Sequence, residues 1–164
     1  DGAEEPLAVA HPPERAVGSR CRLAAPVSLV DRDRQRGAVG AAALAAKTAD
    51  RLVLVSDAMA TIGSAQSSMT LFGEAIAVRD GALRTEAGTL AGAHLEMSGA
   101  VRNAVSMLNA SREDALRMAS ATPAHFMKVG HERGRIAPGH RADMVLLDSD
   151  MNAKATWIGG RQVH

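Results

Sequence analysis

The feature that most constrains the fold is a short apolar run, Leu52 to Val55, that ends abruptly at Asp57. Leucine and valine fill the run, which is typical of a parallel strand buried on both faces. The next residues, Ala58 to Gly63, are small and flexible and predict a turn away from the strand. An acid at the carboxyl end of such a strand lies where α/β enzymes carry their catalytic groups. An aspartate that only closes the strand or caps the next turn is an equally good interpretation.

The segments around this strand have the order of helices, strands and turns that is typical of α/β proteins. Gly73 and the Asp80–Gly81 pair are turn signals between short apolar segments, which predicts antiparallel hairpins. Ser111, with Asp114 three positions later, predicts a capped helix, and Thr122–Pro123 predicts a break. The predicted elements are helices at 38–47, 97–108 and 112–120, a central strand at 52–56, and short strands at 69–72, 74–78, 82–86, 142–148, 155–158 and 161–163.

Length, charge and cysteine content exclude several classes of protein. The 164 residues suffice for one domain core but are too few for a complete barrel of eight strands and eight helices. A net charge of +1 argues against binding of nucleic acid or an acidic membrane, and no apolar run approaches the ~20 residues that span a bilayer. Cys21 is the single cysteine, which excludes a disulfide framework within one chain. Because the first residues lack the layout of a secretion signal, we expect a cytoplasmic protein.

Residues 1–36 differ in character from the rest of the chain. They hold four of the six prolines, and their six arginines are balanced by six acidic residues, which argues against a nucleic-acid-binding arm. One interpretation is a flexible, proline-bearing extension. The other is sequence that does not belong to the domain, as after a disruption of the reading frame.

The histidines do not form a recognisable metal-binding motif. None of the six belongs to a His-x-His or HExxH pattern. His131 and His140 lie in a turn-rich region and are expected to be solvated surface residues. His125 is expected to pack against or cap a helix end. His94 follows the glycine-containing segment 88–93 and is the one histidine that we keep as a candidate.

Other catalytic motifs are absent from the sequence. It contains neither a GxxxxGK[ST] phosphate-binding loop nor a GxGxxG fingerprint, and Ser56 and Ser64 lack the GxSxG setting of a nucleophile. The glycines of 88–93 either let the backbone approach a ligand closely or make a tight turn, and general loop chemistry favours the turn. A catalytic interpretation therefore depends on Asp57.

The sequence around Asp57 carries a specific resemblance. VSDAMATIGS resembles the VTDAMAPAG signature of the N-acetylglucosamine-6-phosphate deacetylases, a family of the amidohydrolase superfamily. The next segment is similar to the family's turn and GTLAGS loop, and it reads RDGALRTEAGTLAGAHLEM. Four further segments follow in the family's order: VRNAV, EDALRMASATPA, GRIAPGHRADMVLLD and ATWIGGRQV. The resemblance covers Ala41 to Val163, and the combination of SDAMA with GTLAG is its most specific part.

The resemblance implies an α/β fold that is the C-terminal part of a (β/α)8 TIM barrel, together with strands of a small β-sandwich lobe. Residues 37–128 would form the last portion of the barrel and 129–164 the strands of the lobe, with 1–36 unassigned. Asp57 would be the general base and then the general acid: it takes a proton from a metal-bound water that attacks the acetamide carbonyl, and returns a proton to the departing amine. Leu90, Ala91 and Gly92 match the segment that contacts the sugar.

The resemblance also implies what this sequence does not contain. The family's metal ligands, one Glu and two His, and its phosphate-binding residues belong to segments upstream of the matching region. A divalent metal, zinc or similar, is thus expected in the complete enzyme, with none bound by ligands present in this chain. The expected substrate is N-acetylglucosamine 6-phosphate, and a homodimer is the expected assembly. The alternatives are a non-catalytic remnant or another amidohydrolase that resembles dihydroorotase.

Overall fold

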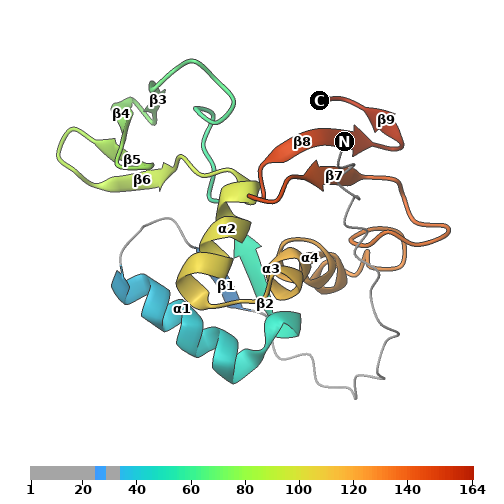
Figure 1. Ribbon diagram of the computed structural model, residues 1–164. Helices are drawn as coiled ribbons and strands as arrows, with labels where there is room; N and C mark the ends of the chain where they lie inside the picture. Colours follow the sequence, from blue (N-terminus) through green and yellow to red (C-terminus); the bar gives the residue numbers. More distant parts are fainter. Residues whose placement is uncertain (1–24, 29–33) are drawn as a thin grey trace, which may run out of the picture.

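This computed structural model describes residues 25–28 and 34–164. Strand β2 (Leu52–Val55) lies at the centre of these residues (Figure 1). It runs parallel to β1 (Ala25–Ser28), with Ala25 opposite Leu52 and Ser28 opposite Val55. The predicted central strand is therefore confirmed, and its neighbour lies within the region 1–36 that the sequence left unassigned.

One face of β2 is fully buried and the other is only partly buried. Leu52 and Leu54 are 1% and 3% exposed, whereas Val53 and Val55 are only partly buried. Successive side chains of a strand point to opposite faces, so the helices cover only the face that carries the two leucines. The prediction that β2 is buried on both faces is therefore wrong for the part of the chain that the structure describes.

The helices pack in chain order and surround the buried face of β2. α1 contacts α2, α2 contacts α3 and α3 contacts α4, while α2, α3 and α4 also contact β2 (Figure 1). None of the helices in the described residues combines the length and the apolar content that crossing a bilayer requires. The elements are α1 (Arg34–Lys47), the 3-10 helix η1 (Ala49–Arg51), α2 (Met97–Leu108), α3 (Arg112–Ala119) and α4 (Ala121–Phe126).

Two helix boundaries differ from the sequence prediction. α1 begins at Arg34, so the predicted boundary at residue 36 falls inside this helix. Residues 1–24 and 29–33 lie outside the described residues, and the two hypotheses for the amino-terminal region stay predictions. The break between α3 and α4 lies at Ser120, ahead of Pro123, which sits in the first turn of α4. A proline is tolerated there because the first N–H groups of a helix have no partner within the helix.

The core beneath β2 consists of small and aliphatic side chains. Ala104, Ala115 and Met118 are completely buried and form one hydrophobic cluster with Leu52 and Leu54. Alanine at helix contacts allows α2 and α3 to approach the strand closely, and the flexible Met118 fills the remaining space.

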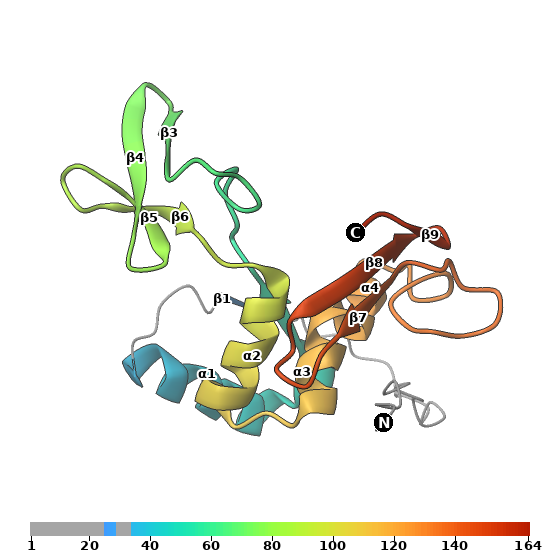
Figure 2. The same cartoon turned by 45° about the horizontal axis from the view of Figure 1, so that its top comes forward.

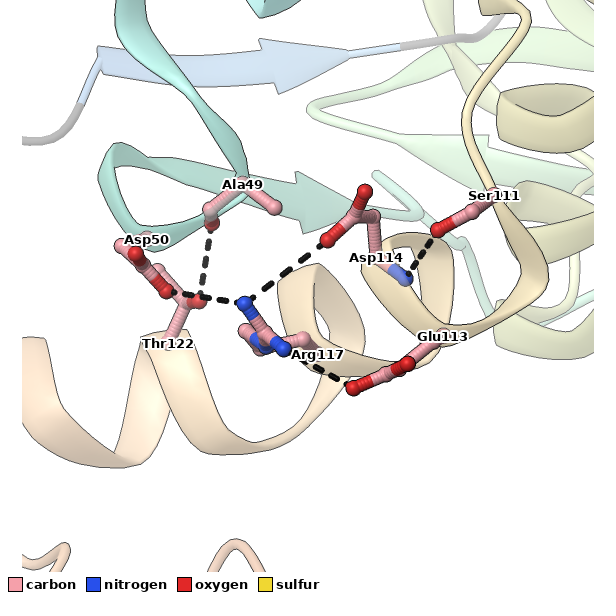
Figure 3. A network of polar contacts seen from close by, with 7 residues as sticks. All are labelled: Ala49, Asp50, Ser111, Glu113, Asp114, Arg117 and Thr122. Carbon is pink, nitrogen blue, oxygen red and sulfur yellow. Dashed lines mark hydrogen bonds and ion pairs between the residues drawn. The ribbon is translucent and has the colours of Figure 1, made fainter. Parts of the chain in front are cut away.

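An ionic network fixes α3 to η1, the segment that leads into β2 (Figure 3). The Ser111 hydroxyl caps α3 by accepting a hydrogen bond from the Asp114 amide at 3.0 Å, which confirms the predicted cap. The Arg117 guanidinium contacts Asp50 at 3.3 Å and Glu113 at 3.0 Å, and it lies 3.7 Å from Asp114. Since only the Asp50 contact joins two elements, that pair is the one that ties α3 to η1.

A buried hydrogen bond reinforces this attachment from α4. The Thr122 hydroxyl donates to the Ala49 carbonyl at 2.9 Å, and both residues are buried (Figure 3). A buried hydroxyl or carbonyl without a partner is costly, so this pair holds the start of β2 against the helices.

A four-stranded antiparallel sheet extends away from the helices (Figure 2). The predicted hairpin at Asp80–Gly81 is confirmed, because both residues have the positive φ angles of a two-residue hairpin turn. The strands of this sheet have the same order in space as in the chain: β3 (Ser68–Leu71), β4 (Glu74–Arg79), β5 (Ala82–Thr85) and β6 (Leu90–Ala93).

The last part of the chain forms a separate three-stranded antiparallel sheet of β7 (Met144–Leu147), β8 (Ala153–Ile158) and β9 (Arg161–Gln162). Arg102 of α2 connects it to the helices by donating to the Met151 carbonyl at 3.3 Å and to the Asn152 side chain at 3.0 Å. Asp143 accepts from the Gly159 amide at 2.7 Å, which holds the β8–β9 turn and lowers the pKa of this carboxyl.

We expect Met118→Ala to lower the free energy of unfolding by about 2–5 kcal/mol, because the truncation leaves a cavity at a completely buried position. Urea denaturation followed by circular dichroism measures the change. Met127→Ala is the matched control: this methionine is 67% exposed, and its truncation should change the free energy by no more than about 0.5 kcal/mol. Equal effects of the two substitutions would contradict the position of the core.

Asp148 gives the β7–β8 turn a dependence on pH. Its carboxylate accepts from the Asn152 amide at 2.8 Å and from the Lys154 ammonium at 3.3 Å. The Asn152 backbone bond first, and then the side chains of Asn152 and Lys154, hold the pKa of Asp148 at about 2, below its ordinary 3.8. Because the folded state has the lower pKa, this group stabilises the fold above pH 3.8, and the contribution disappears as the pH falls towards 2.

We therefore expect Asp148→Asn to destabilise the protein at pH 6, and we expect the difference from the unsubstituted protein to shrink as the pH approaches 2. Urea midpoints measured from pH 6 to pH 2 test this. Asp150→Asn, an exposed position on the same turn, is the control. A difference that stays constant over this pH range would refute the role of the carboxylate.

Candidate functional site

Asp57 lies at the carboxyl end of β2 in a left-handed backbone conformation, with a φ of 52°. Aspartate tolerates this conformation better than most residues, yet it still requires support from the surroundings. The Ala93 amide donates to the Asp57 carbonyl at 2.9 Å, and the Met59 amide donates to the Ala93 carbonyl at 3.2 Å. These bonds and a parallel bridge between Ala58 and Ala93 attach the end of β6 to residues 57–59, which directly follow β2.

The predicted substrate-binding residues, Leu90, Ala91 and Gly92, belong to β6. The favoured interpretation of the whole segment 88–93 as a tight turn is therefore wrong. The turn spans residues 85–88, and Gly88 ends it by donating its amide to the Thr85 carbonyl at 2.9 Å. Gly92 instead allows β6 to lie close to the side chain of Met59. A Cβ at this position would lie 2.5 Å from Met59 Cγ, and its φ of 154° is unfavourable for residues with a side chain.

The structure thus brings Asp57 and the Leu90–Gly92 segment together, although more than thirty positions separate them in the chain. Asp57 is exposed and Leu90 is 41% exposed, whereas Gly92 is buried. An exposed carboxylate beside a partly exposed strand is an arrangement in which a proton-transferring group can meet a bound ligand.

Thr61 is the residue at this site that sequence reasoning missed. It is 1% exposed, and its Oγ1 shares a hydrogen bond of 3.0 Å with Nδ1 of the half-buried His94. One feature of the sequence could have identified it. Thr61 stands where the VTDAMAPAG pattern has a proline, and a hydroxyl at the place of an apolar residue needs a hydrogen-bond partner. His94, kept as a candidate from the sequence, is therefore engaged with a hydroxyl.

The described residues do not fit a metal centre by themselves. In residues 25–28 and 34–164, no group of three or more His, Cys, Asp or Glu side chains is placed to hold an ion. Asp57 and His94 are the acidic and imidazole residues closest in sequence to the contact between Ala93 and residues 57–59. A catalytic zinc site needs three protein ligands, and these two residues do not supply them.

The remaining histidines lie away from this junction in the sequence. His125 and His131 are exposed, which confirms the prediction for His131. The prediction for His140 is wrong, because this residue is half-buried: its Nε2 lies 3.3 Å from the Gly130 carbonyl and 3.2 Å from Arg135 Nε, and its Nδ1 is buried. The turn-rich segment folds back on itself here, since the Arg141 amide donates to the Glu132 carbonyl at 2.7 Å.

Comparisons with known proteins agree on one family. The sequence profile of the Amidohydrolase family matches residues 21–163. An N-acetylgalactosamine-6-phosphate deacetylase of Shewanella is 42% identical over 124 residues, which are 75% of this chain and 31% of that protein. A putative N-acetylgalactosamine-6-phosphate deacetylase of Escherichia coli is 38% identical over 68% of this chain and 67% of its own length.

A solved structure gives the same result. The N-acetylglucosamine-6-phosphate deacetylase of Pasteurella multocida superimposes with a TM-score of 0.73 at 31% identity, over 77% of this chain and 33% of that one. This chain therefore spans about a third of the length of the Shewanella and Pasteurella proteins, and about two thirds of the Escherichia coli protein.

We expect Gly92→Ala to displace the segment after Asp57, because the new methyl group collides with Met59. Hydrogen exchange at the Met59 amide should accelerate by about tenfold or more as its bond to Ala93 weakens. Adding Met59→Ala should restore part of the protection by removing the collision. Gly88→Ala, with a positive φ but no atom within 4 Å of the new methyl, controls for backbone strain alone. Unchanged exchange at Met59 would contradict the close approach.

Proposed function

The chain belongs to the amidohydrolase family, and we propose that it supplies the carboxyl-terminal part of an enzyme that hydrolyses the acetamide of an N-acetylhexosamine 6-phosphate. The observation that carries the proposal is the junction at Ala93, which joins the strand of Leu90–Gly92 to the strand end of Asp57. The Shewanella and Pasteurella proteins described above are named as deacetylases of such sugars.

Asp57 is the proton-transferring residue of this proposal. Its carboxylate takes a proton from the water molecule whose oxygen attacks the acetamide carbon. It then gives a proton to the nitrogen as the carbon–nitrogen bond breaks, so the products are acetate and the free amine. Exposure of Asp57 at the strand end supports this role, since a proton-transferring group has to reach the reacting atoms.

Leu90, Ala91 and Gly92 are the substrate-contacting residues of the proposal. The partly exposed Leu90 offers an apolar surface for the sugar or its acetyl group. Gly92 contributes by the absence of a side chain, which lets β6 lie against Met59 and keeps the segment next to Asp57.

The complete site needs residues beyond those described. We propose that a divalent metal, zinc or similar, and the sugar phosphate are held by segments that correspond to the remaining two thirds of the longer relatives. The proposed oligomeric state of the complete enzyme is a homodimer. The chain alone is expected to show no meaningful turnover.

The relatives leave two substrates to compare. N-Acetylglucosamine 6-phosphate is named for the Pasteurella structure at 31% identity, and N-acetylgalactosamine 6-phosphate for the Shewanella protein at 42% identity. The two sugars differ in configuration at one carbon, C4. The higher identity favours N-acetylgalactosamine 6-phosphate as a second candidate substrate, and both are to be assayed.

A chimera tests the proposed function. Residues 41–163 replace the matching segment of the Shewanella deacetylase, and acetate release is measured with each of the two sugar phosphates. We expect the chimera to be active and Asp57→Asn to lower kcat by about 10²–10⁴-fold, the usual contribution of a general acid or base. Asp150→Asn is the control with unchanged activity.

Two outcomes would overturn this proposal. A folded but inactive chimera would assign the chain to the non-catalytic alternative. Full activity of a folded Asp57→Asn chimera would place the proton transfer on another residue.

A further inference from the structure

We propose that Thr61 and His94 act as positioning residues: their hydrogen bond fastens the turn after Asp57 onto the end of β6 and thereby sets the position of Asp57 relative to Leu90–Gly92. The fastening itself is a structural claim about this chain. Its consequence for catalysis rests on the proposed function.

The turn after Asp57 is attached to β6 at two points. The first is the backbone junction of Ala93 with Asp57 and Met59. The second is the side-chain bond between Thr61 and His94, at 3.0 Å. Because Ala93 and His94 are adjacent in the chain, one short piece of backbone holds both the beginning and the middle of the turn.

Burial makes the second attachment strong. Thr61 is 1% exposed, so its hydroxyl is shielded from the water that would otherwise satisfy it. Leaving such a group without a partner is more costly than the net gain from an ordinary hydrogen bond. The imidazole of His94 is the partner of this buried hydroxyl in the structure.

His94 is itself held in place by the backbone. Its amide donates to the Gly81 carbonyl at 3.1 Å, at the hairpin turn between β4 and β5. The turn that carries Thr61 is closed by bonds from the Ile62 amide to the Met59 carbonyl and from the Ser64 amide to the Thr61 carbonyl, at 3.0 and 3.3 Å. Both ends of the fastening are thus attached to hydrogen-bonded turns.

The backbone conformation of Asp57 is the feature that the bond between Thr61 and His94 supports. A residue other than glycine keeps a φ of 52° only when its surroundings hold it there. A proline at the place of Thr61, as in VTDAMAPAG, would stiffen the turn through its fixed φ. Threonine has no such restriction, so in this chain the bond to His94 supplies the stiffness.

The first test uses the full chain as it is. Thr61→Val keeps the shape of the side chain and removes the hydroxyl, and Thr61→Ser keeps the hydroxyl. Hydrogen exchange followed by NMR is expected to be at least about fivefold faster at the Met59 and Ile62 amides in Thr61→Val, and unchanged in Thr61→Ser. The nitrogen chemical shifts of the His94 ring should change in Thr61→Val alone.

The Ala104 amide, in the core of α2, reports on global stability. Unchanged exchange at Met59 and Ile62 in a folded Thr61→Val variant would overturn the proposal. If Thr61→Val accelerates exchange at Ala104 equally, His94→Ala is measured instead. Faster exchange confined to the turn supports the fastening, and acceleration equal to that of Ala104, or none, overturns it.

The second test uses the active chimera. Thr61→Val should lower kcat by about tenfold with little change in KM, because a displaced base slows the proton transfer, and Thr61→Ser should restore kcat. A change confined to KM, or no change, would overturn the positioning role. An inactive chimera would refute the proposed function and leave the exchange measurements as the test of the fastening.

Discussion

The burial of Leu52 and Leu54 against α2 and α3 organises the described structure. It removes the apolar face of β2 from water and fixes the direction of the strand. The contacts of Arg117 and Thr122 hold the start of the strand (Figure 3). With one end attached to the helices, the other end of β2 presents Asp57 at a defined place.

Asp57 lies where two structural units meet. The helices and β2 form one unit, and the antiparallel sheet of β3 to β6 forms the other (Figure 2). The units join through the backbone of Ala93, the close approach of Gly92 to Met59, and the bond of Thr61 to His94. This junction is small, so each of its contacts contributes to the geometry of the candidate site.

The proposed function explains two observations together: the face of β2 with Val53 and Val55 is only partly buried, and the described residues hold no metal cluster. In a TIM barrel the inner side chains of each strand are covered by those of the other strands. The matching part of this chain covers about a third of the solved relative. The missing cover and the missing ligands would then belong to the same segments.

The local elements and the family could be predicted from the sequence alone. Helical spacing over 97–108, the cap at Ser111 and the turn at Asp80–Gly81 depend on neighbouring residues, so they were predictable, as was the strand that ends before Asp57. The covered face of β2 and the hydrogen bond of Thr61 with His94 became evident from the fold. Those properties depend on how distant segments pack, and short-range periodicity carries no information about that packing.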